Sequence, residues 1–154
     1  MENANSVRST QLTNCKLSGK QSPKTKVEKV ETIKVSYATA IGSLMYSMVC
    51  TRSDTVYVVG VVSQFMSNPG TYHWATVKWI LWYIKGTSSV CLRFSSNKPL
   101  LEGFTNSDMS VDVDTRRSTF GYVMAYARGV VSWQSRLQKF VTLSTTEAEY
   151  MVVV

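Results

Sequence analysis

From Ala38 onward, hydrophobic residues follow a helical period, which predicts an amphipathic helix with Ser36 as its N-cap. Its apolar face consists of Ile41, Leu44, Met45 and Met48. The same period returns between Asp54 and Ser67, where the apolar face consists of Val58, Val62, Phe65 and Met66. The valine-rich middle of this second segment also suits a strand. Because the run is long and the period fits, we expect a helix.

A third helix is predicted from Tyr72 to Lys85, after a break at residues 68–70 (Asn-Pro-Gly). Its apolar side consists of Trp74, Val77, Leu81 and Ile84. Gly86 follows as a favoured C′ residue. Three helices with short connections predict a small bundle over residues 37–88.

After Thr87 the hydrophobic period changes to two, which is typical of strands. The expected strands are Val90 to Phe94, Leu100 to Asn106, Gly121 to Ala127 and Val130 to Ser135. The first two surround a turn at residues 96–99, and the last two form a hairpin closed at Arg128 and Gly129. A further helix is expected to begin at Ser144. Strands followed by a helix indicate an α+β or α/β layer.

The first 36 residues are polar and rich in Ser, Thr and Lys, so we expect a mostly disordered leader. The formal net charge of +7 favours acidic partners, of which a nucleic-acid backbone is the commonest. The leader contains seven Lys and Arg against three Glu, and so accounts for +4 of this excess. The remaining +3 is ordinary for a globular surface.

Composition narrows the class of protein further. Hydrophobic content of 44% with four Trp, eight Tyr and five Phe predicts a packed core. Cys15, Cys50 and Cys91 match no metal-ligand spacing and suggest reduced thiols. No signal peptide is visible, and no apolar run approaches the ~20 residues of a membrane span. We expect a soluble intracellular protein, in cytoplasm or nucleus, without His-based catalysis because His73 is the only histidine.

Two acidic clusters carry the candidate chemistry, Gly103 to Asp114 and Ser144 to Tyr150. Carboxylates delivered from a strand and from a following helix are what a two-metal phosphodiester hydrolase needs. This sequence contains fewer carboxylates at these positions than such a site needs. Asn106 stands where a carboxylate would be expected, and the chain stops four residues after Tyr150.

Within these clusters, Asp108 lies two residues beyond Asn106 and so shares its strand face, about 7 Å away at ~3.3 Å per residue. A solvated acidic turn is the favoured alternative for Asp108, Asp112 and Asp114. Ser144 and Glu147 have the spacing of a capping box, which makes Glu147 a structural residue and leaves Glu149 for chemistry.

Five ordered blocks of sequence carry a family resemblance. They are GSLMYSMVCTRSD (42–54), VVSQFMSNPG (61–70), HWATVKWILWYIKGT (73–87), RRSTFGYV (116–123) and VSWQSRLQKFVTLSTTEAEY (131–150). Together they resemble the Pol polyprotein of copia-type retrotransposons, from the end of the reverse transcriptase into the start of ribonuclease H. The resemblance covers about Leu17 to the end of the chain.

This resemblance implies a role for each candidate residue. The family's first strand reads close to Y-T-D-A-D with a metal-binding leading Asp, whose place is taken here by Asn106. Glu149 matches the second catalytic carboxylate, and Asp108 is the other candidate ligand for the Mg²⁺ or Mn²⁺ that the family uses. The helical segment looks like the thumb or connection that grips primer and template. Lys78 and Lys85 would contact phosphates there, although solvated lysines and core-packed aromatic residues are the favoured alternatives.

We therefore expect an α+β protein with three parts: a leader (1–36), a thumb- or connection-like helical bundle (37–88), and an incomplete ribonuclease H-like mixed sheet with a helix (89–154). The parent activities are RNA-directed DNA synthesis and hydrolysis of RNA in an RNA:DNA hybrid, and we expect this copy to perform neither. Alternatives are a non-catalytic module that binds RNA:DNA hybrid or other nucleic acid, and a fragment that pairs with other Pol chains through an open sheet edge. No membrane partner is expected.

Overall fold

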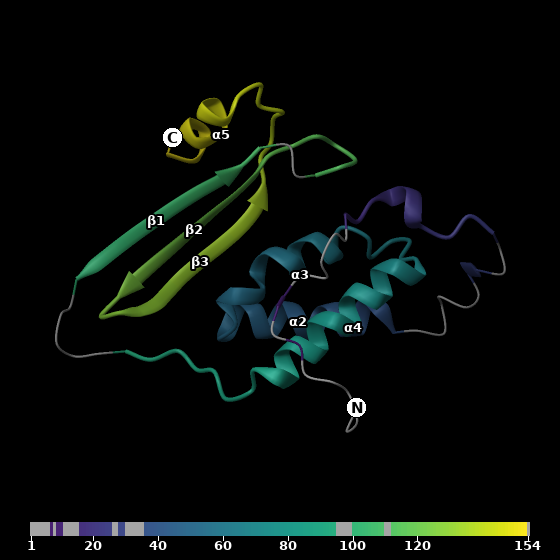
Figure 1. The fold of residues 1–154 in the computed structure, drawn as a ribbon, viewed down its shortest axis with the longest axis horizontal. Helices are drawn as coiled ribbons and strands as arrows, with labels where there is room; N and C mark the ends of the chain where they lie inside the picture. The colour runs from purple at the N-terminus through teal and green to yellow at the C-terminus, as the bar shows by residue number, and fades with distance from the viewer. Residues whose placement is uncertain are drawn as a thin grey trace. The chain divides into compact units, whose positions relative to one another are not determined.

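The computed structural model describes residues 7, 9–10, 16–25, 28–29, 36–94, 100–109 and 112–153. The chain divides into two compact units, Met1–Val90 and Cys91–Val154, two residues from the predicted boundary. Helices α2, α3 and α4 belong to the first unit, whereas strands β1 to β3 and helix α5 belong to the second (Figure 1). Helices and an antiparallel sheet in separate units make this an α+β protein.

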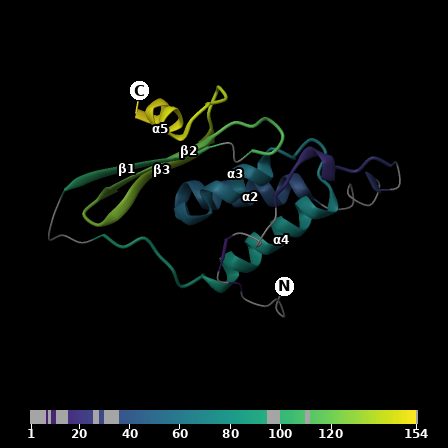
Figure 2. The same cartoon turned by 45° about the horizontal axis from the view of Figure 1, so that its top comes forward.

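The helical unit contains α2 (Tyr37–Cys50), a 3-10 turn η2 (Ser53–Thr55) that leads into α3 (Val56–Ser63), and α4 (Thr71–Gly86). The predicted choice of helix over strand for the valine-rich segment is confirmed. This helix ends at Ser63, however, and the four residues that follow form turns. Figure 2 shows the three helices of this unit from a second direction.

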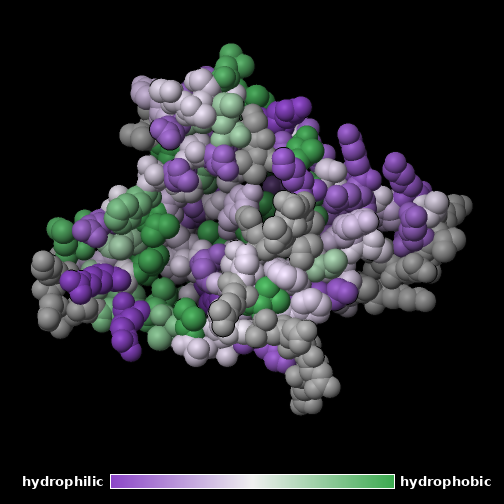
Figure 3. Space-filling view, viewed as in Figure 1, coloured by the Kyte–Doolittle hydropathy of each residue, from purple (hydrophilic) through white to green (hydrophobic). Residues whose placement is uncertain are grey.

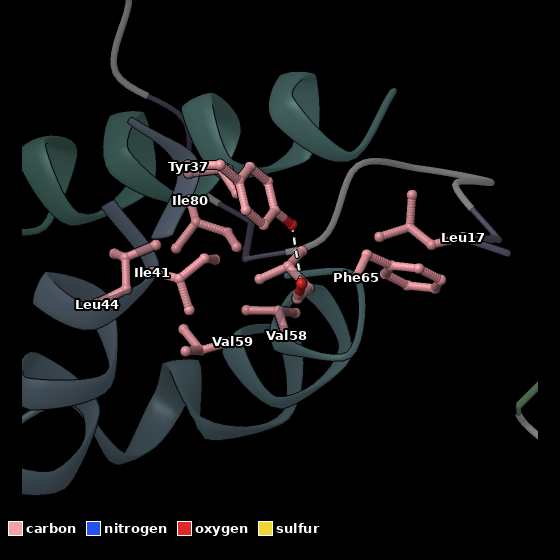
Figure 4. Packing of buried hydrophobic residues seen from close by; sticks show 10 residues of the cluster. Leu17, Tyr37, Ile41, Leu44, Val58, Val59, Phe65 and Ile80 are labelled. Atoms are coloured by element: carbon pink, nitrogen blue, oxygen red, sulfur yellow. Dashed lines mark hydrogen bonds between the residues drawn. The ribbon is translucent and has the colours of Figure 1, made fainter. Parts of the chain in front are cut away.

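The core of the helical unit is a cluster of apolar side chains from all three helices (Figure 4). Its buried members are Leu17, Tyr37, Ile41, Leu44, Val58, Val59, Val62, Phe65, Val77 and Ile80. The hydroxyl of Tyr37 donates a hydrogen bond of 2.8 Å to the Val62 carbonyl, so α2 and α3 are joined by a polar contact within an apolar core. Met48, Trp74, Leu81 and Ile84 pack against the cluster as predicted.

Three local predictions for the helical unit, concerning Met45, Met66 and Gly86, are wrong. Met45 and Met66 are 39% and 45% exposed, because each lies beside the buried face and not within it. The prediction of Ser36 as the N-cap of α2 is confirmed, although its side chain makes no capping hydrogen bond. Gly86 is the last residue of α4 and has no left-handed conformation, and Thr87 is the C-cap.

The described part of the predicted leader includes a segment that packs against the helices. Leu17 is 7% exposed and belongs to the core cluster, and η1 (Gly19–Gln21) follows it. A Cβ atom at Gly70 would lie 2.1 Å from the carbonyl oxygen of Gln21. A glycine is therefore required where this segment crosses the start of α4. Residues 1–6, 8, 11–15, 26–27 and 30–35 of the leader lie outside the described residues.

The second unit is built on a three-stranded antiparallel sheet in the order β1-β2-β3. Its elements are β1 (Leu101–Asp108), β2 (Thr119–Tyr126), β3 (Gly129–Leu137) and α5 (Thr145–Val153). All three strands and the helix were predicted, but the predicted mixed sheet is wrong for the described residues, where both strand pairings are antiparallel. The residues from Val90 to Phe94, predicted as a strand, form none, and the turn predicted at residues 96–99 lies outside the described residues.

The hairpin between β2 and β3 turns at Ala127 and Arg128, one residue earlier than predicted. Both residues have positive φ, 50° and 66°, as a two-residue turn of the twisted hairpin type requires. Gly129 pairs with Tyr126 in the sheet instead of lying in the turn. An added Cβ would come within 2.3 Å of the Phe94 ring, so a larger residue here would require this exposed ring to move.

Candidate metal centre and nucleic-acid interface

Strand β1 holds the first two candidate metal ligands. Asn106 pairs with Gly121 and Asp108 pairs with Thr119 of the neighbouring strand. Alternate residues of a strand point to the same side of the sheet, so Asn106 and Asp108 share a face and Ser107 points to the other. Both candidate side chains are exposed to solvent.

Helix α5 is held on the Ser107 side of the sheet by Gln138, which follows β3. The Gln138 side-chain amide donates a hydrogen bond of 2.7 Å to the carbonyl of Ala148 and a longer one of 3.4 Å to the Ser107 hydroxyl. Gln138 is 6% exposed and Ala148 is 1% exposed, so this contact is buried. The backbone N–H of Gln138 also donates to the Ser118 carbonyl at 2.8 Å. Gln138, directly after β3, therefore links Ser107 of β1 and the residue before β2 to α5.

The first turn of α5 is capped much as the sequence predicts. The N–H of Glu147 donates to the Ser144 hydroxyl at 3.1 Å. The Glu147 carboxylate accepts from the N–H of Leu143 at 2.8 Å, one residue further back than in a capping box. Glu147 is thus a structural residue, and Glu149 on the same helix is an exposed carboxylate.

The three candidate ligands do not form the carboxylate cluster that a pair of divalent cations needs. Asn106 and Asp108 lie on the sheet face opposite Ser107, whereas Glu149 belongs to the helix docked on the Ser107 face. Throughout the described ranges, no group of three or more His, Cys, Asp or Glu side chains could hold a metal ion. An amide at residue 106 contributes no charge and cannot bridge two cations. These residues do not fit a two-metal centre.

Helix α4 positions the two lysines predicted to contact nucleic acid. Lys78 and Lys85 are seven residues apart and both exposed, so they lie on one stripe of the helix, about 10 Å apart at ~1.5 Å per residue. Trp82 lies between them on the same stripe, four residues after Lys78 and three before Lys85. Its ring is 6.4 Å from that of Trp79. The opposite face of α4, which includes Val77 and Ile80, is buried.

An ionic cluster connects the loop after α2 with the end of α4, and sequence reasoning missed it. Arg52, 7% exposed, donates to both carboxylate oxygens of Asp54 at 3.0 and 2.8 Å. Its guanidinium also donates to the hydroxyl of Thr87 at 2.6 Å and lies 5.3 Å from the centre of the Tyr83 ring. The Tyr83 hydroxyl donates to Asp54 at 2.7 Å.

This cluster shifts the ionisation of its members. Burial raises the pKa of Asp54, but the hydrogen bonds from Arg52 and Tyr83 outweigh it and leave that pKa below its ordinary value. Hydrogen bonding to Asp54 raises the pKa of Arg52 and also that of Tyr83. The only sequence signal was the Arg-Ser-Asp tripeptide itself, since the partners on α4 are about thirty residues away.

No family model matches the chain, and no solved structure matches it. Several curated proteins do match the chain. The chain is 52% identical over 151 residues to the retrovirus-related Pol polyprotein from transposon TNT 1-94 of Nicotiana tabacum, which covers 98% of the chain and 11% of the relative. It is 36% identical over 118 residues to the retrovirus-related Pol polyprotein from transposon RE2 of Arabidopsis thaliana, covering 76% of the chain and 8% of the relative.

A shorter relative also matches. The secreted RxLR effector protein 161 of Plasmopara viticola is 43% identical over 120 residues, which is 77% of the chain and 84% of the relative. The chain spans about a tenth of the length of the two Pol polyproteins. No helix among the described residues is long and apolar enough to cross a membrane. On the strength of the 52% identity over almost its whole length, the chain belongs to the retrovirus-related Pol polyproteins of copia-type transposons.

Proposed function

We propose that the chain corresponds to the part of a copia-type Pol polyprotein that joins the end of the reverse transcriptase to the start of ribonuclease H. The parent activities are RNA-directed DNA synthesis and hydrolysis of RNA in an RNA:DNA hybrid. The order of elements supports this: a helical unit comes first, and an antiparallel sheet followed by α5 comes second. A ribonuclease H-like arrangement, with a first strand bearing the leading acid and a following helix bearing the second, has its counterparts in β1 and α5.

The chain itself is proposed to be inactive as a ribonuclease. The observation that carries this proposal is Asn106, an exposed amide on β1 at the position of the leading metal-binding Asp. A two-metal site needs anionic ligands that neutralise and position two neighbouring cations, because the cations stabilise the attacking and leaving oxygens. Asp108 and Glu149 are the two carboxylates left, and they lie on opposite sides of the sheet.

Incubation of the purified chain with an RNA:DNA hybrid in Mg²⁺ or Mn²⁺ tests this proposal. We expect no cleavage of the RNA strand above the rate of a no-protein control. The matched variant is Glu149→Ala, which changes an exposed residue and should leave the fold intact. Metal-dependent cleavage that survives repurification and is lost in Glu149→Ala would contradict the proposal.

A second function, binding of nucleic acid without cleavage, is favoured by the surface of α4. Lys78 and Lys85 can neutralise phosphates two turns apart, and the partly exposed Trp82 between them offers a face for a base or sugar. Binding that rests on phosphate contacts releases counterions, so affinity should fall steeply with added salt and depend little on sequence.

Fluorescence anisotropy with a labelled hybrid at 50 and 200 mM salt tests this function. Replacing both lysines, Lys78→Gln with Lys85→Gln, should weaken binding and reduce the slope of log affinity against log salt by about 1.8, since each contact contributes about 0.9. Lys139→Gln, which removes an exposed lysine from the other unit, is the control. An affinity that is flat with salt, or equal in the double variant and the control, would argue against it.

A further inference from the structure

A short segment of the leader, residues 16–25, is fixed against the helical unit, and we call it the docked segment. Leu17 is part of the hydrophobic core, and Ser18 is 6% exposed. The backbone N–H of Ser18 donates to the side-chain oxygen of Gln21 at 3.4 Å, and the Gln21 side-chain amide donates to the Lys16 carbonyl at 3.2 Å. The segment therefore has a defined conformation, although the sequence predicts a mostly disordered leader.

Two contacts place the leader on α4. The Gln21 carbonyl lies against Gly70, at the start of the helix, where no Cβ atom fits. The indole N–H of Trp79 donates a hydrogen bond of 3.0 Å to the carbonyl of Ser9. Gly70 and Trp79 are nine residues apart, which is about 14 Å along a helix at ~1.5 Å per residue. The leader thus touches α4 at its start and again at its middle.

The three lysines of the docked segment, Lys16, Lys20 and Lys24, are exposed. Figure 3 shows hydrophilic residues in purple over the region that Figure 1 assigns to this segment. Lys24 lies close to Glu28, whose carboxylate accepts a hydrogen bond of 3.0 Å from the Lys24 N–H. The segment itself contains no acidic residue, and neither Lys16 nor Lys20 forms an ion pair with another described residue. These two lysines therefore add positive charge beside the start of α4.

Helix α4 adds further cations and no acid to this surface. It contains no Asp or Glu, and Lys78 and Lys85 are exposed on it. Together with Lys16 and Lys20 they make four lysines on two segments in contact, with no carboxylate in either segment. Such a concentration of one charge attracts a polyanion, which neutralises several lysines at once. Trp82, partly exposed between the helix lysines, favours a nucleic acid over an acidic peptide because bases stack on aromatic rings.

We propose that the docked segment and α4 form one nucleic-acid-binding surface, in which phosphates contact Lys16 and Lys20 as well as the lysines of α4. This proposal rests on the nucleic-acid binding proposed above for α4. Docking matters because lysines on a fixed backbone need not be ordered at the moment of binding, and such ordering costs affinity. By thermodynamic linkage, a nucleic acid that prefers the docked segment must in turn stabilise its docking.

Removing the two lysines tests their contacts with phosphates. Fluorescence anisotropy of the full chain with a labelled RNA:DNA hybrid at 50 and 200 mM salt compares the double variant Lys16→Gln, Lys20→Gln with the unchanged chain. The slope of log affinity against log salt should fall by about 1.8, since each phosphate contact contributes about 0.9. The matched control, Arg117→Gln with Lys139→Gln, removes the same charge from exposed positions of the sheet unit and should leave the slope nearly unchanged.

Undocking the segment without changing any charge tests the role of docking. Leu17→Ser removes the anchor of the segment in the core and should weaken binding of the hybrid severalfold. Leu143→Ser, at a leucine that is 89% exposed, should leave binding unchanged. Hydrogen exchange on the unchanged chain gives a second measurement that needs no substitution, because the hybrid should slow amide exchange in residues 16–25.

The outcomes separate this proposal from the one on which it rests. Equal slopes for the Lys16, Lys20 variant and its control, with weakened binding in a Lys78, Lys85 variant, would overturn the shared surface and leave binding by α4 standing. Exchange in residues 16–25 that does not change with the hybrid would also overturn it, as would an equal affinity for polyglutamate. No binding of the hybrid at all would overturn both proposals.

Discussion

Asp54→Asn is the substitution whose effect can be worked out most fully from the structure. It keeps the size of the side chain but removes the charge that faces the buried Arg52. Arg52 would keep its contacts with Thr87 and the Tyr83 ring, but one of its two hydrogen bonds to residue 54 would meet an amide N–H instead of an oxygen. The guanidinium would then be buried without a counterion.

Removing one partner of a fully buried ion pair typically costs about 3–5 kcal/mol. The Asp54 side chain is 37% exposed, so water can replace part of what is lost. After a discount for this screening we expect a loss of about 2 kcal/mol in the free energy of unfolding. For a unit of this size such a loss corresponds to a fall of roughly 10 °C in Tm.

The loss should depend on pH in a defined direction. The folded-state pKa of Asp54 is lowered, so its charge stabilises the fold fully above the unfolded-state pKa, near the ordinary value of 3.8. That contribution disappears as the pH falls from about 4 through the lower folded-state pKa. Asp54→Asn lacks this contribution at every pH. The difference in stability between the unchanged chain and the variant should therefore be largest at neutral pH and shrink in acid.

Thermal unfolding followed by circular dichroism at pH 7 and below pH 4 measures both effects. Asp108→Asn is the matched control, because it removes the same charge from an exposed position in the other unit. A second check replaces both partners, Arg52→Met with Asp54→Leu, which should cost less than the sum of the single changes because neither charge is then left without its partner. A change below about 0.5 kcal/mol for Asp54→Asn would refute the argument, since surface substitutions already reach that size.

Two further predictions concern residues that are set by packing. Gly70→Ala should destabilise the helical unit by more than about 2 kcal/mol, the size expected of overpacking, because its Cβ would lie 2.1 Å from the Gln21 carbonyl oxygen. Gly42→Ala should instead raise the stability by about 0.5–1 kcal/mol, because the space around its Cβ in α2 is open. Denaturant titration should show that the two substitutions shift the unfolding midpoint in opposite directions. Gln138→Leu should speed amide hydrogen exchange in α5 because the hydrogen bond to the Ala148 carbonyl is lost. Gln134→Leu on β3 is the control. Equal exchange rates in α5 of the two variants would contradict the role assigned to Gln138.

Much of the secondary structure follows from the sequence alone because it depends on local periodicity. The three helices of the first unit each bury side chains at helical spacing, such as Ile41 with Leu44 and Val58 with Val62. In the second unit the alternation of period two located β1, β2 and β3 to within one to two residues at each end. The capping hydrogen bond of Ser144 also follows from residues close in the chain.

The limits of the buried helix faces and of the strands were predicted less well. A period does not say where a buried face stops, so Met45 and Met66 were predicted to be buried and are exposed. The apolar residues from Val90 to Phe94 alternate like a strand but have no neighbouring strand to pair with in the described structure. A strand exists only through hydrogen bonds to a partner, and local sequence cannot supply that partner.

For the candidate site, the sequence determined the chemistry and the tertiary structure decided the geometry. Asn106 in place of an acid, and the carboxylates of Asp108 and Glu149, are visible in the sequence. That the two acids lie on opposite sides of the sheet depends on α5 docking on the Ser107 face, which Gln138 enforces from thirty-one residues away. The Arg52 cluster likewise joins residues distant in sequence, because folding energy comes from contacts that the chain makes only once its elements have packed.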